Sequence, residues 1–462
     1  MKIQYVSICP TESAKQNGCY ELTPELLAAT GARYSRNNEG LDAIVSKIDF
    51  SNTDKSVDGI FKMVDYGHAS IADMAPIALF IDDISLFAAY FLWTLAPTAG
   101  GQECSTRYIK LDAGSVVDDD TLGIPEHLKL DYWKYVENSF KSYELALDHW
   151  TSLGTSNPEM TMIPTSLINS TSEKDKKQVA RMMRNFAFDR ARVYLPVSAM
   201  TGVMMIQSAR AWANLSAHLQ SHPLRELNLV GKEIEEKLKV GAPRLVKHCR
   251  ATDSIKEYYK YEYSFENNYC KMKNKFLPSS NQCDTNLKVH SNKKINLDAL
   301  SFRANRYSPF GHTVSQIPVT FSWEGITFGE IRDLNRHRTG SKYCSLVPIG
   351  FYGATDQLSS EKNDSIISEK IKQLFTNFAK TTTYARDLML SNPEYIYFTS
   401  LGHKYYFEHT TTADKFIYEM ELRTGVGAHY KYAEHCHKML ELWYQKYPET
   451  KGLIFEGSAE PE

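Results

Sequence analysis

The chain has 462 residues, of which 42% are hydrophobic, and this length and composition favour two or three domains with packed cores. Its 53 basic and 55 acidic residues give a formal net charge of −2, which excludes a general attraction to nucleic acid polymers, so we expect any phosphate binding to be local. Eight scattered cysteines without CxxC pairs, and a start (MKIQYVSICP) that lacks the regions of a signal peptide, favour a reducing, cytoplasmic location.

The first predicted elements are a helix, a turn and a second helix between Tyr20 and Ile48. Thr23 suits the N-cap of the first helix and Pro24 its first position. Ser35 then falls in the connecting loop.

A strand (MAPIALFI) and a helix (SLFAAYFLWTL) follow. This apolar stretch, residues 74–96, is long enough for a membrane span, but Asp82 and Asp83 lie near its middle, where charge is costly in lipid. We therefore expect a buried strand and helix and no membrane association. The paired Gly100 and Gly101 after the helix allow close approach to a ligand, although a plain turn explains them equally well.

Apolar and aromatic side chains at helical spacing predict a long, core-packed helix from Pro125 to about Leu153. Between residues 179 and 248 we expect helices broken by Pro196 and Pro223. Further helices are predicted at about 360–391 and within 412–447.

One local pattern occurs twice in the chain, at Gly67–Leu111 and at Gly311–Tyr343. Each copy has Gly-His, a strand-like apolar stretch, a hinge (DDIS or EGIT) and a helix-like stretch. A repeat at this separation predicts a duplicated domain. We expect two tandem α+β domains, at 1–250 and 297–462, each with a small mixed or antiparallel sheet and long helices, joined by a polar connector at 251–296.

The two copies end differently. The second ends in the basic triplet Arg336, His337 and Arg338, whose guanidinium groups suit phosphates and flat rings. Such a triplet is often a solvated surface, but after an apolar element in a repeated domain it becomes a candidate nucleotide site. The first copy ends in QECSTRY, in which Ser105 and Arg107 suit a phosphate and the amide and acid suit a base or sugar.

Other candidate side chains have an ordinary structural explanation. Arg192 and Arg423 add positive charge but are equally consistent with ion-pair partners. The consecutive His435, Cys436 and His437 point in different directions on a helix and lack the spacing of metal ligands. We expect no metal site.

These motifs resemble the hallmark of the flavin-dependent thymidylate synthases: Arg-His-Arg, two residues, Ser, one residue, Asn-Glu, one residue, then Ser-x-Arg-Tyr. In the first half Leu95, Ala96 and Pro97 replace the basic triplet, and the second half loses the end of the motif. The resemblance covers about 22–247 and 300–448. It implies a hallmark divided between two halves, so that one complete site needs residues from both.

The resemblance also implies roles for single residues. The positions that match flavin-binding residues are Ser35, His68, Ser70, Arg210, Asn214, Arg336, His337 and Arg338. The positions that match nucleotide-binding residues are Gln102, Glu103, Ser105, Arg107, Arg192, Leu422 and Arg423. Arg423 is the candidate catalytic residue, because it would polarise the uracil carbonyl.

The implied reaction is the methylation of dUMP to dTMP, with FAD as cofactor and methylenetetrahydrofolate and NADPH as co-substrates. Cys104 is not expected to act as a nucleophile and is interpreted as a small buried residue. We expect a homodimer that forms a pseudo-tetramer. Two alternatives stay open, because Leu95 departs from the hallmark: a related flavin-dependent C5 modification of a pyrimidine nucleotide, and a non-catalytic nucleotide- or flavin-binding homologue.

Overall fold

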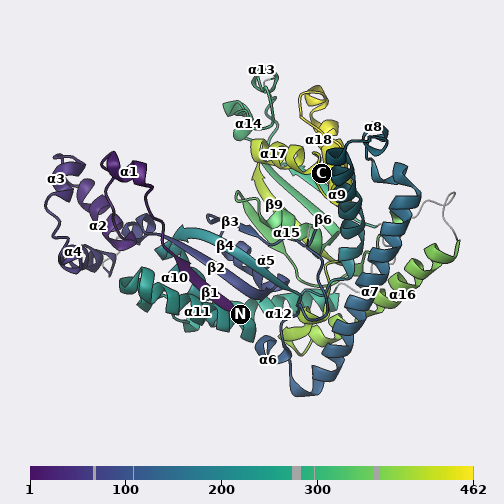
Figure 1. Cartoon of the computed structure of the whole chain (residues 1–462), viewed down its shortest axis with the longest axis horizontal. Helices are drawn as coiled ribbons and strands as arrows, with labels where there is room; N and C mark the ends of the chain where they lie inside the picture. Colours follow the sequence, from purple (N-terminus) through teal and green to yellow (C-terminus); the bar gives the residue numbers. More distant parts are fainter. Residues whose placement is uncertain (66–68, 108, 273–281, 296, 358–364, 461–462) are drawn as a thin grey trace. The chain divides into compact units, whose positions relative to one another are not determined.

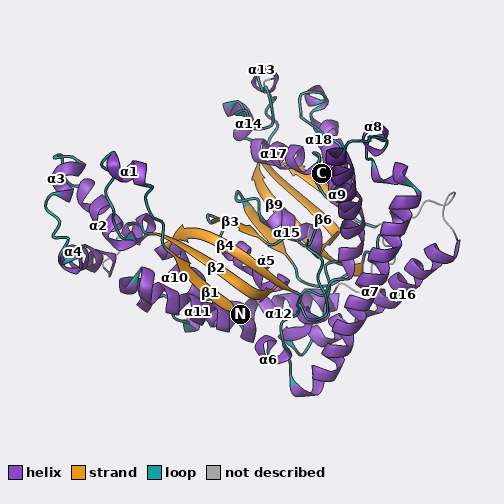
Figure 2. Ribbon diagram, in the orientation of Figure 1, coloured by secondary structure: helices purple, strands orange, loops and turns teal. Residues whose placement is uncertain are grey.

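The computed structural model describes residues 1–65, 69–107, 109–272, 282–295, 297–357 and 365–460 and divides into two compact units, each with its own sheet (Figures 1 and 2). The first unit comprises Met1–Cys104, Val116–Ile124 and Ser198–Ser264, and the second comprises Ser105–Ser115, Pro125–Val197 and Phe265–Glu462. Both combine helices with an antiparallel sheet, which confirms the α+β class.

The sheet of the first unit has four antiparallel strands in the order β1-β2-β4-β3. These strands are β1 (Lys2–Val6), β2 (Pro76–Ser85), β4 (Met200–Ser208) and β3 (Gly100–Glu103). The predicted stretch MAPIALFI forms most of β2, and SLFAAYFLWTL forms its end and helix α5 (Leu86–Leu95). Among the described residues no helix is both long and apolar enough to cross a membrane.

The second unit repeats this strand order. Its sheet runs β5-β6-β9-β7, with β8 also paired to β9, and all of these pairs are antiparallel. The strands are β5 (Asp284–Val289), β6 (Pro318–Thr327), β9 (His403–Thr412), β7 (Ser341–Cys344) and β8 (Gly350–Phe351).

A bulge and a capped helix recur at the same place in both sheets. The register of β2 shifts between Ile81 and Ile84, with Asp83 at a φ of 58°, and that of β6 shifts between Glu324 and Ile326. Gly325 lies in the second bulge at a φ of 110°, which glycine adopts without strain. Each bulged strand then leads directly into a helix, α5 in one unit and α15 (Phe328–Asn335) in the other.

The helices of the first unit pack around its sheet and around one another. Thr23 caps α2 (Pro24–Tyr34) as predicted, accepting a hydrogen bond from the Leu26 amide. This helix packs against the short helix η1 (Ala69–Met74), which in turn packs against α10 (Ala209–Ser221). The remaining helices of the unit are α1 (Glu12–Gln16), α3 (Leu41–Val45), α4 (Thr53–Asp65), α6 (Asp119–Leu122), α11 (Arg225–Gly241) and η5 (Pro243–His248).

Long helices cover the sheet of the second unit. The predicted aromatic helix is α7 (Lys129–Ser156), which buries Tyr132, Val136 and Phe140 but leaves Leu130 and Trp133 exposed. It packs against α9 (Glu173–Ala191). Further α-helices of this unit are α8 (Thr165–Ile168), α13 (Asp298–Ser301), α14 (His312–Ser315), α16 (Ser365–Met389), α17 (Ala413–Arg423) and α18 (Tyr430–Lys446).

Several sequence predictions need revision. Within 179–248 the structure forms strand β4 where only broken helices were expected, and β9 was likewise missed. The stretch 412–447 forms two helices, since Gly425 and Gly427 follow α17. The expected connector 251–296 contains helix α12 (Asp253–Met272) and the edge strand β5. Cys104 is exposed, so its interpretation as a buried residue was wrong.

The bulge and helix start of the first unit depend on Glu226 of α11, whose carboxylate accepts hydrogen bonds of 2.7 Å from both the amide and the hydroxyl of Ser85. Both residues are buried. We predict that Glu226→Ala lowers the free energy of unfolding by about 1.5–3 kcal/mol, because it leaves these donors unsatisfied. Urea denaturation checks this value. Glu233→Ala on the same helix, which removes a half-exposed side chain, should change stability by less than about 0.5 kcal/mol; equal effects would contradict the prediction.

Candidate functional site

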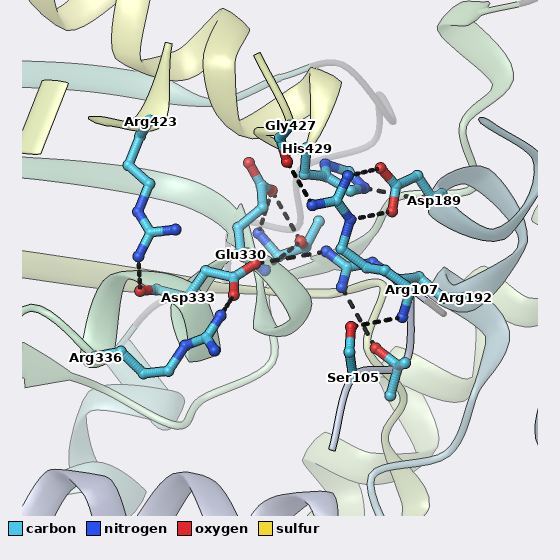
Figure 3. Close-up of polar contacts among 12 residues, drawn as sticks. Ser105, Arg107, Asp189, Arg192, Glu330, Asp333, Arg336, Arg423, Gly427 and His429 are labelled. Atoms are coloured by element: carbon cyan, nitrogen blue, oxygen red, sulfur yellow. Dashed lines mark hydrogen bonds and ion pairs between the residues drawn. The ribbon is translucent and has the colours of Figure 1, made fainter. Parts of the chain in front are cut away.

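Arg107 forms the centre of a polar cluster within the second unit (Figure 3). Its Nε and Nη2 donate to the two carboxylate oxygens of Asp189 at 2.6 and 2.7 Å, and its Nη1 donates to the carbonyl oxygen of Gly427 at 2.6 Å. Its backbone amide donates to the Ser105 hydroxyl at 3.2 Å. The guanidinium is therefore fixed in orientation by a bidentate pair.

Asp189 is ionised because arginines surround it. The residue is 2% exposed; burial raises the pKa of its carboxyl, but the positive charges of Arg107 and Arg192 and the nearby His429 lower it to about 2. Nε2 of His429 forms a hydrogen bond of 3.0 Å with the carbonyl oxygen of Asp189. Burial lowers the pKa of the His429 imidazole to about 4. The carboxylate is thus charged and the imidazole neutral near neutral pH.

A second acidic residue, Asp333 at the end of α15, contacts three further arginines through its carboxylate or its carbonyl oxygen. It pairs with Arg336, lies 3.8 Å from Nη2 of the buried Arg192, and its carbonyl oxygen accepts a hydrogen bond of 3.0 Å from Nη2 of Arg423. Burial raises the pKa of the Asp333 carboxyl, but these arginines lower it far more. Arg192 also donates to the Thr106 hydroxyl at 3.4 Å.

His337 accepts a hydrogen bond of 2.9 Å at Nε2 from Nε of Arg423. Burial lowers the pKa of His337 to about 3, so the imidazole is neutral, and its role as acceptor places the proton on Nδ1. That nitrogen lies 4.0 Å from the buried Glu419, which also lies 3.1 Å from Nδ1 of His409. This chain of contacts orients Arg423, whose guanidinium also lies over the Tyr432 ring.

The cluster has the chemistry of an anion site. It combines the guanidiniums of Arg107, Arg192, Arg336 and Arg423 with the carboxylates of Asp189 and Asp333, and Glu330 lies in the same view (Figure 3). Oriented guanidiniums favour a bound phosphate or carboxylate. Because the arginines are already fixed, little side-chain entropy remains to be lost on binding.

The structure brings together predicted residues from both halves of the sequence. Arg107 and Arg192 come from the first half, whereas Arg336 and Arg423 come from the second. The other residues of this unit that were predicted to bind nucleotide or to form the basic triplet are Ser105, His337, Arg338 and Leu422. Arg338 is exposed, and the other three are partly exposed.

Other predicted residues lie in the first unit. Ser35 follows α2, Ser70 is in η1, and Arg210 and Asn214 are on α10, so the structure places these four exposed side chains on neighbouring elements. Arg210 pairs with Asp73 at 2.9 Å. Gln102 and Glu103 are on β3 of the same unit. His68, and Tyr108 of the hallmark, lie outside the described residues.

The carboxylates of the cluster were missed from the sequence. Asp189 precedes Arg192 by three residues, and Asp333 precedes Arg336 by the same spacing on a helix, which is the spacing of a local ion pair. That signal was available for Arg336. It was not available for the bidentate partner of Arg107, since these two residues are 82 positions apart.

The second unit is thus an α+β unit that contains a cluster of fixed arginines. Residues 20–244 match the family described as thymidylate synthase complementing protein, the flavin-dependent thymidylate synthases. The match to this family confirms, for residues 20–244, the resemblance seen in the sequence.

Other comparisons add little. No curated protein matches the chain. Solved structures do match, among them a UMP/dUMP methylase, PolB, from Streptomyces cacaoi, bound with 5-Br dUMP. That chain is 16% identical, with a TM-score of 0.33, and the alignment covers 54% of this chain and 93% of the methylase. At this score the likeness supports no inference about activity.

The buried ion pair of Arg107 predicts a strong and pH-dependent effect of Asp189→Asn. Removing one charge of a buried pair should lower the free energy of unfolding by about 3–5 kcal/mol near neutral pH. Because the folded-state pKa of Asp189 is depressed to about 2, the stabilisation is present above the unfolded pKa of about 4 and is lost as the pH falls toward about 2. Chemical denaturation of both proteins across this range measures the difference.

Glu173→Gln is the matched control, since Glu173 is on the same helix in an exposed pair with Lys176. It should cost less than about 1 kcal/mol. A difference between wild type and Asp189→Asn that does not shrink in acid would contradict the prediction.

Proposed function

We propose that the chain methylates dUMP to dTMP with FAD, methylenetetrahydrofolate and NADPH, at a site composed of both halves of the sequence. The observation that carries this proposal is the arginine cluster of the second unit. There Arg107 and Arg192 of the first half lie in one network with Arg336 and Arg423 of the second. The match of residues 20–244 to the flavin-dependent thymidylate synthase family supports the same class of reaction.

In this proposal the nucleotide phosphate binds to Arg107 and Arg192, and Arg423 approaches the uracil carbonyl. Arg423 uses Nε and Nη2 for its contacts with His337 and Asp333, and Nη1 takes part in neither of them. A guanidinium fixed by a neutral imidazole keeps its full charge for the carbonyl. It would stabilise the negative charge that develops there as the pyrimidine ring is attacked.

The donors at the predicted flavin positions suit a dinucleotide. Hydroxyls of Ser35 and Ser70, the guanidinium of Arg210 and the amide of Asn214 are exposed on neighbouring elements of the first unit. These groups match phosphate and ribose oxygens. A bound flavin would supply the hydride transfer that these side chains cannot perform.

We further propose that the chain arose by tandem duplication and that two chains form a pseudo-tetramer. The shared strand order, the bulge in β2 and β6 and the capped helices that follow them support the duplication. In a duplicated chain, one copy is free to lose a motif that the other keeps.

The substrate proposal predicts that Arg423→Ala and Arg107→Lys each weaken dUMP binding about tenfold to a hundredfold. The first variant loses a charged hydrogen bond, and the second keeps the charge but loses the bidentate geometry. Isothermal titration with dUMP measures the affinity. Mass spectrometry of dTMP formed from dUMP, methylenetetrahydrofolate and NADPH measures turnover.

Arg181→Ala, an exposed change on α9, is the matched control and should leave both quantities unchanged. If only one of Arg107 and Arg423 affects binding, the halves do not share a site. Bound FAD and dUMP without dTMP would exclude thymidylate synthesis and favour a related C5 modification.

The cofactor proposal predicts that Arg336→Ala reduces FAD affinity by about tenfold or more, because a charge-assisted contact to phosphate is lost. Quenching of flavin fluorescence on titration with the purified protein measures this affinity. Lys415→Ala, which removes an exposed lysine of α17, is the control. Unchanged FAD affinity in Arg336→Ala would assign the basic triplet to the surface, and a wild-type chain that binds no flavin would favour the non-catalytic alternative.

A further inference from the structure

A short segment of the second unit, residues 455–460, is fastened to the end of α17. The amide of Phe455 donates a hydrogen bond of 3.0 Å to Oε1 of Glu421. The amide of Gly457 donates one of 3.3 Å to the hydroxyl of Thr424. We call residues 455–460 the strap, because these two contacts hold one part of it while its other part reaches a different helix.

That other part of the strap carries a buried acid. Oε1 of Glu460 lies 3.1 Å from Nη2 of Arg190, on α9, and the two residues are 8% and 3% exposed. The guanidinium of Arg190 also lies over the rings of Phe186 and Tyr430, with its central carbon 3.7 and 4.0 Å from the ring centres. Arg190 is therefore a fixed cation that holds the carboxylate of the strap.

Glu460 also lines a small cavity beside the arginine cluster. The cavity has a volume of about 10 Å³, and the residues around it include Arg107, Asn185, Asp189, Gly427 and Glu460. This volume is about the least that a single water molecule needs. A phosphate group is several times larger than a water molecule and does not fit. With the strap in place, this side of the Arg107 guanidinium is thus closed to a phosphate.

A buried amide at this cavity has no partner. Asn185 precedes Asp189 by about one turn of α9 and is 6% exposed. Neither its Oδ1 nor its Nδ2 has a hydrogen-bond partner in the part of the chain that the structure describes. Burying an amide costs free energy unless its donor and acceptor are used. Asn185 is therefore available to a polar group that enters when the cavity is larger.

The strap is held in place at a cost. Burial raises the pKa of the Glu460 carboxyl above its usual value, Arg190 and Arg107 lower it by less, and Asp189 adds to the rise. The ionised carboxylate is therefore less stable here than in water. Glu460 also has a φ of 52°, a left-handed conformation that is unfavourable for residues other than glycine. Both features favour a strap that can be displaced.

We propose that the strap is an autoinhibitory element of the arginine cluster. In place, it closes the cavity beside Arg107 and adds the negative charge of Glu460 to that of Asp189. Displaced, it gives a phosphate access to Arg107 and to the amide of Asn185. A phosphate bound there and Glu460 repel each other, so the binding of one weakens the binding of the other. This inference rests on the proposed function, in which Arg107 binds the nucleotide phosphate, and adds a means of regulating that site.

Glu460→Gln tests the charge of the strap. Glutamine keeps the size of the side chain and removes the repulsion, so the full chain should bind inorganic phosphate about tenfold more tightly than the wild type in isothermal titration. Glu449→Gln, which removes an exposed acid shortly before the strap, is the matched control and should leave this affinity unchanged. Equal phosphate affinity in the wild type and Glu460→Gln, including no binding to either, would overturn the proposal.

Gly457→Ala tests the position of the strap without changing its charge. A Cβ on Gly457 would lie 2.9 Å from the Cα of Gly425 and 3.2 Å from the carbonyl oxygen of Thr424. Because both are backbone atoms, the strap has to move away from them. Phosphate affinity should then rise about threefold or more, whereas Ser458→Ala, an exposed change, should have no effect. An affinity in Gly457→Ala at or below that of the wild type would contradict the proposal.

Hydrogen exchange of the wild-type chain measures displacement directly. Saturating inorganic phosphate should speed exchange of the Phe455 and Gly457 amides about tenfold, because displacement breaks their hydrogen bonds. Exchange that stays the same or slows would overturn the proposal. Assay of dTMP separates this result from the proposed function. Faster exchange without dTMP formation would retain the strap and reject thymidylate synthesis, whereas dTMP formation with unchanged exchange and unchanged phosphate affinity would reject the strap alone.

Discussion

The second unit depends on the buried pair of Arg107 and Asp189. Arg107 follows β3 in the sequence, Asp189 is near the end of α9, and Gly427 and His429 lie between α17 and α18, so one bidentate contact and its two neighbours join three distant stretches of chain. A buried ion pair contributes little net stability compared with apolar packing, but breaking it is costly. Its effect is therefore chiefly to fix where these stretches lie.

The same constraint explains how four arginines can share one small region. Guanidiniums at this spacing repel one another unless carboxylates lie between them. Asp189 faces Arg107, and Asp333 faces Arg336 and approaches Arg192. Both acids are held in the ionised form by the cations around them. The guanidiniums of the site are thus already ordered.

The sequence predicted those parts of the fold that depend on local chemistry. Thr23 and Pro24 at the start of α2 and the apolar run of β2 and α5 were predicted because capping and periodicity act over a few residues. Strand β9 (HKYYFEHTTT) was missed because it lacks an apolar run, and β4 was missed because it lies within a stretch that was expected to be helical. Of the site, the basic residues were identified through the family hallmark, but the carboxylates that orient them were not, since the hallmark does not relate Arg107 to a residue so far away.

The strand order is shared by the two units, but the chemistry at the ends of their helices is not. Helix α5 ends at Leu95 with no basic residue in its last turn, and eight of its ten residues are buried. The corresponding helix α15 contains Glu330, Arg332 and Asp333 and leads into Arg336. Leu219 on α10 and Arg423 on α17 likewise occupy corresponding positions. Each lies the same number of residues after the N-cap of its helix, which is Ser208 for α10 and Thr412 for α17.

At two corresponding positions the first unit thus has leucine where the second has arginine. Leu95 corresponds to Arg336, the start of the basic triplet, and Leu219 corresponds to Arg423. A helix packed on nearly all sides has no room for a solvated charge, which accounts for the absence of a basic residue from the last turn of α5. Helix α5 of the first unit contributes mainly to packing, whereas α15 of the second unit carries charged side chains. Under the proposed duplication, this division between the units gives the described part of the chain one arginine cluster in place of two weaker copies.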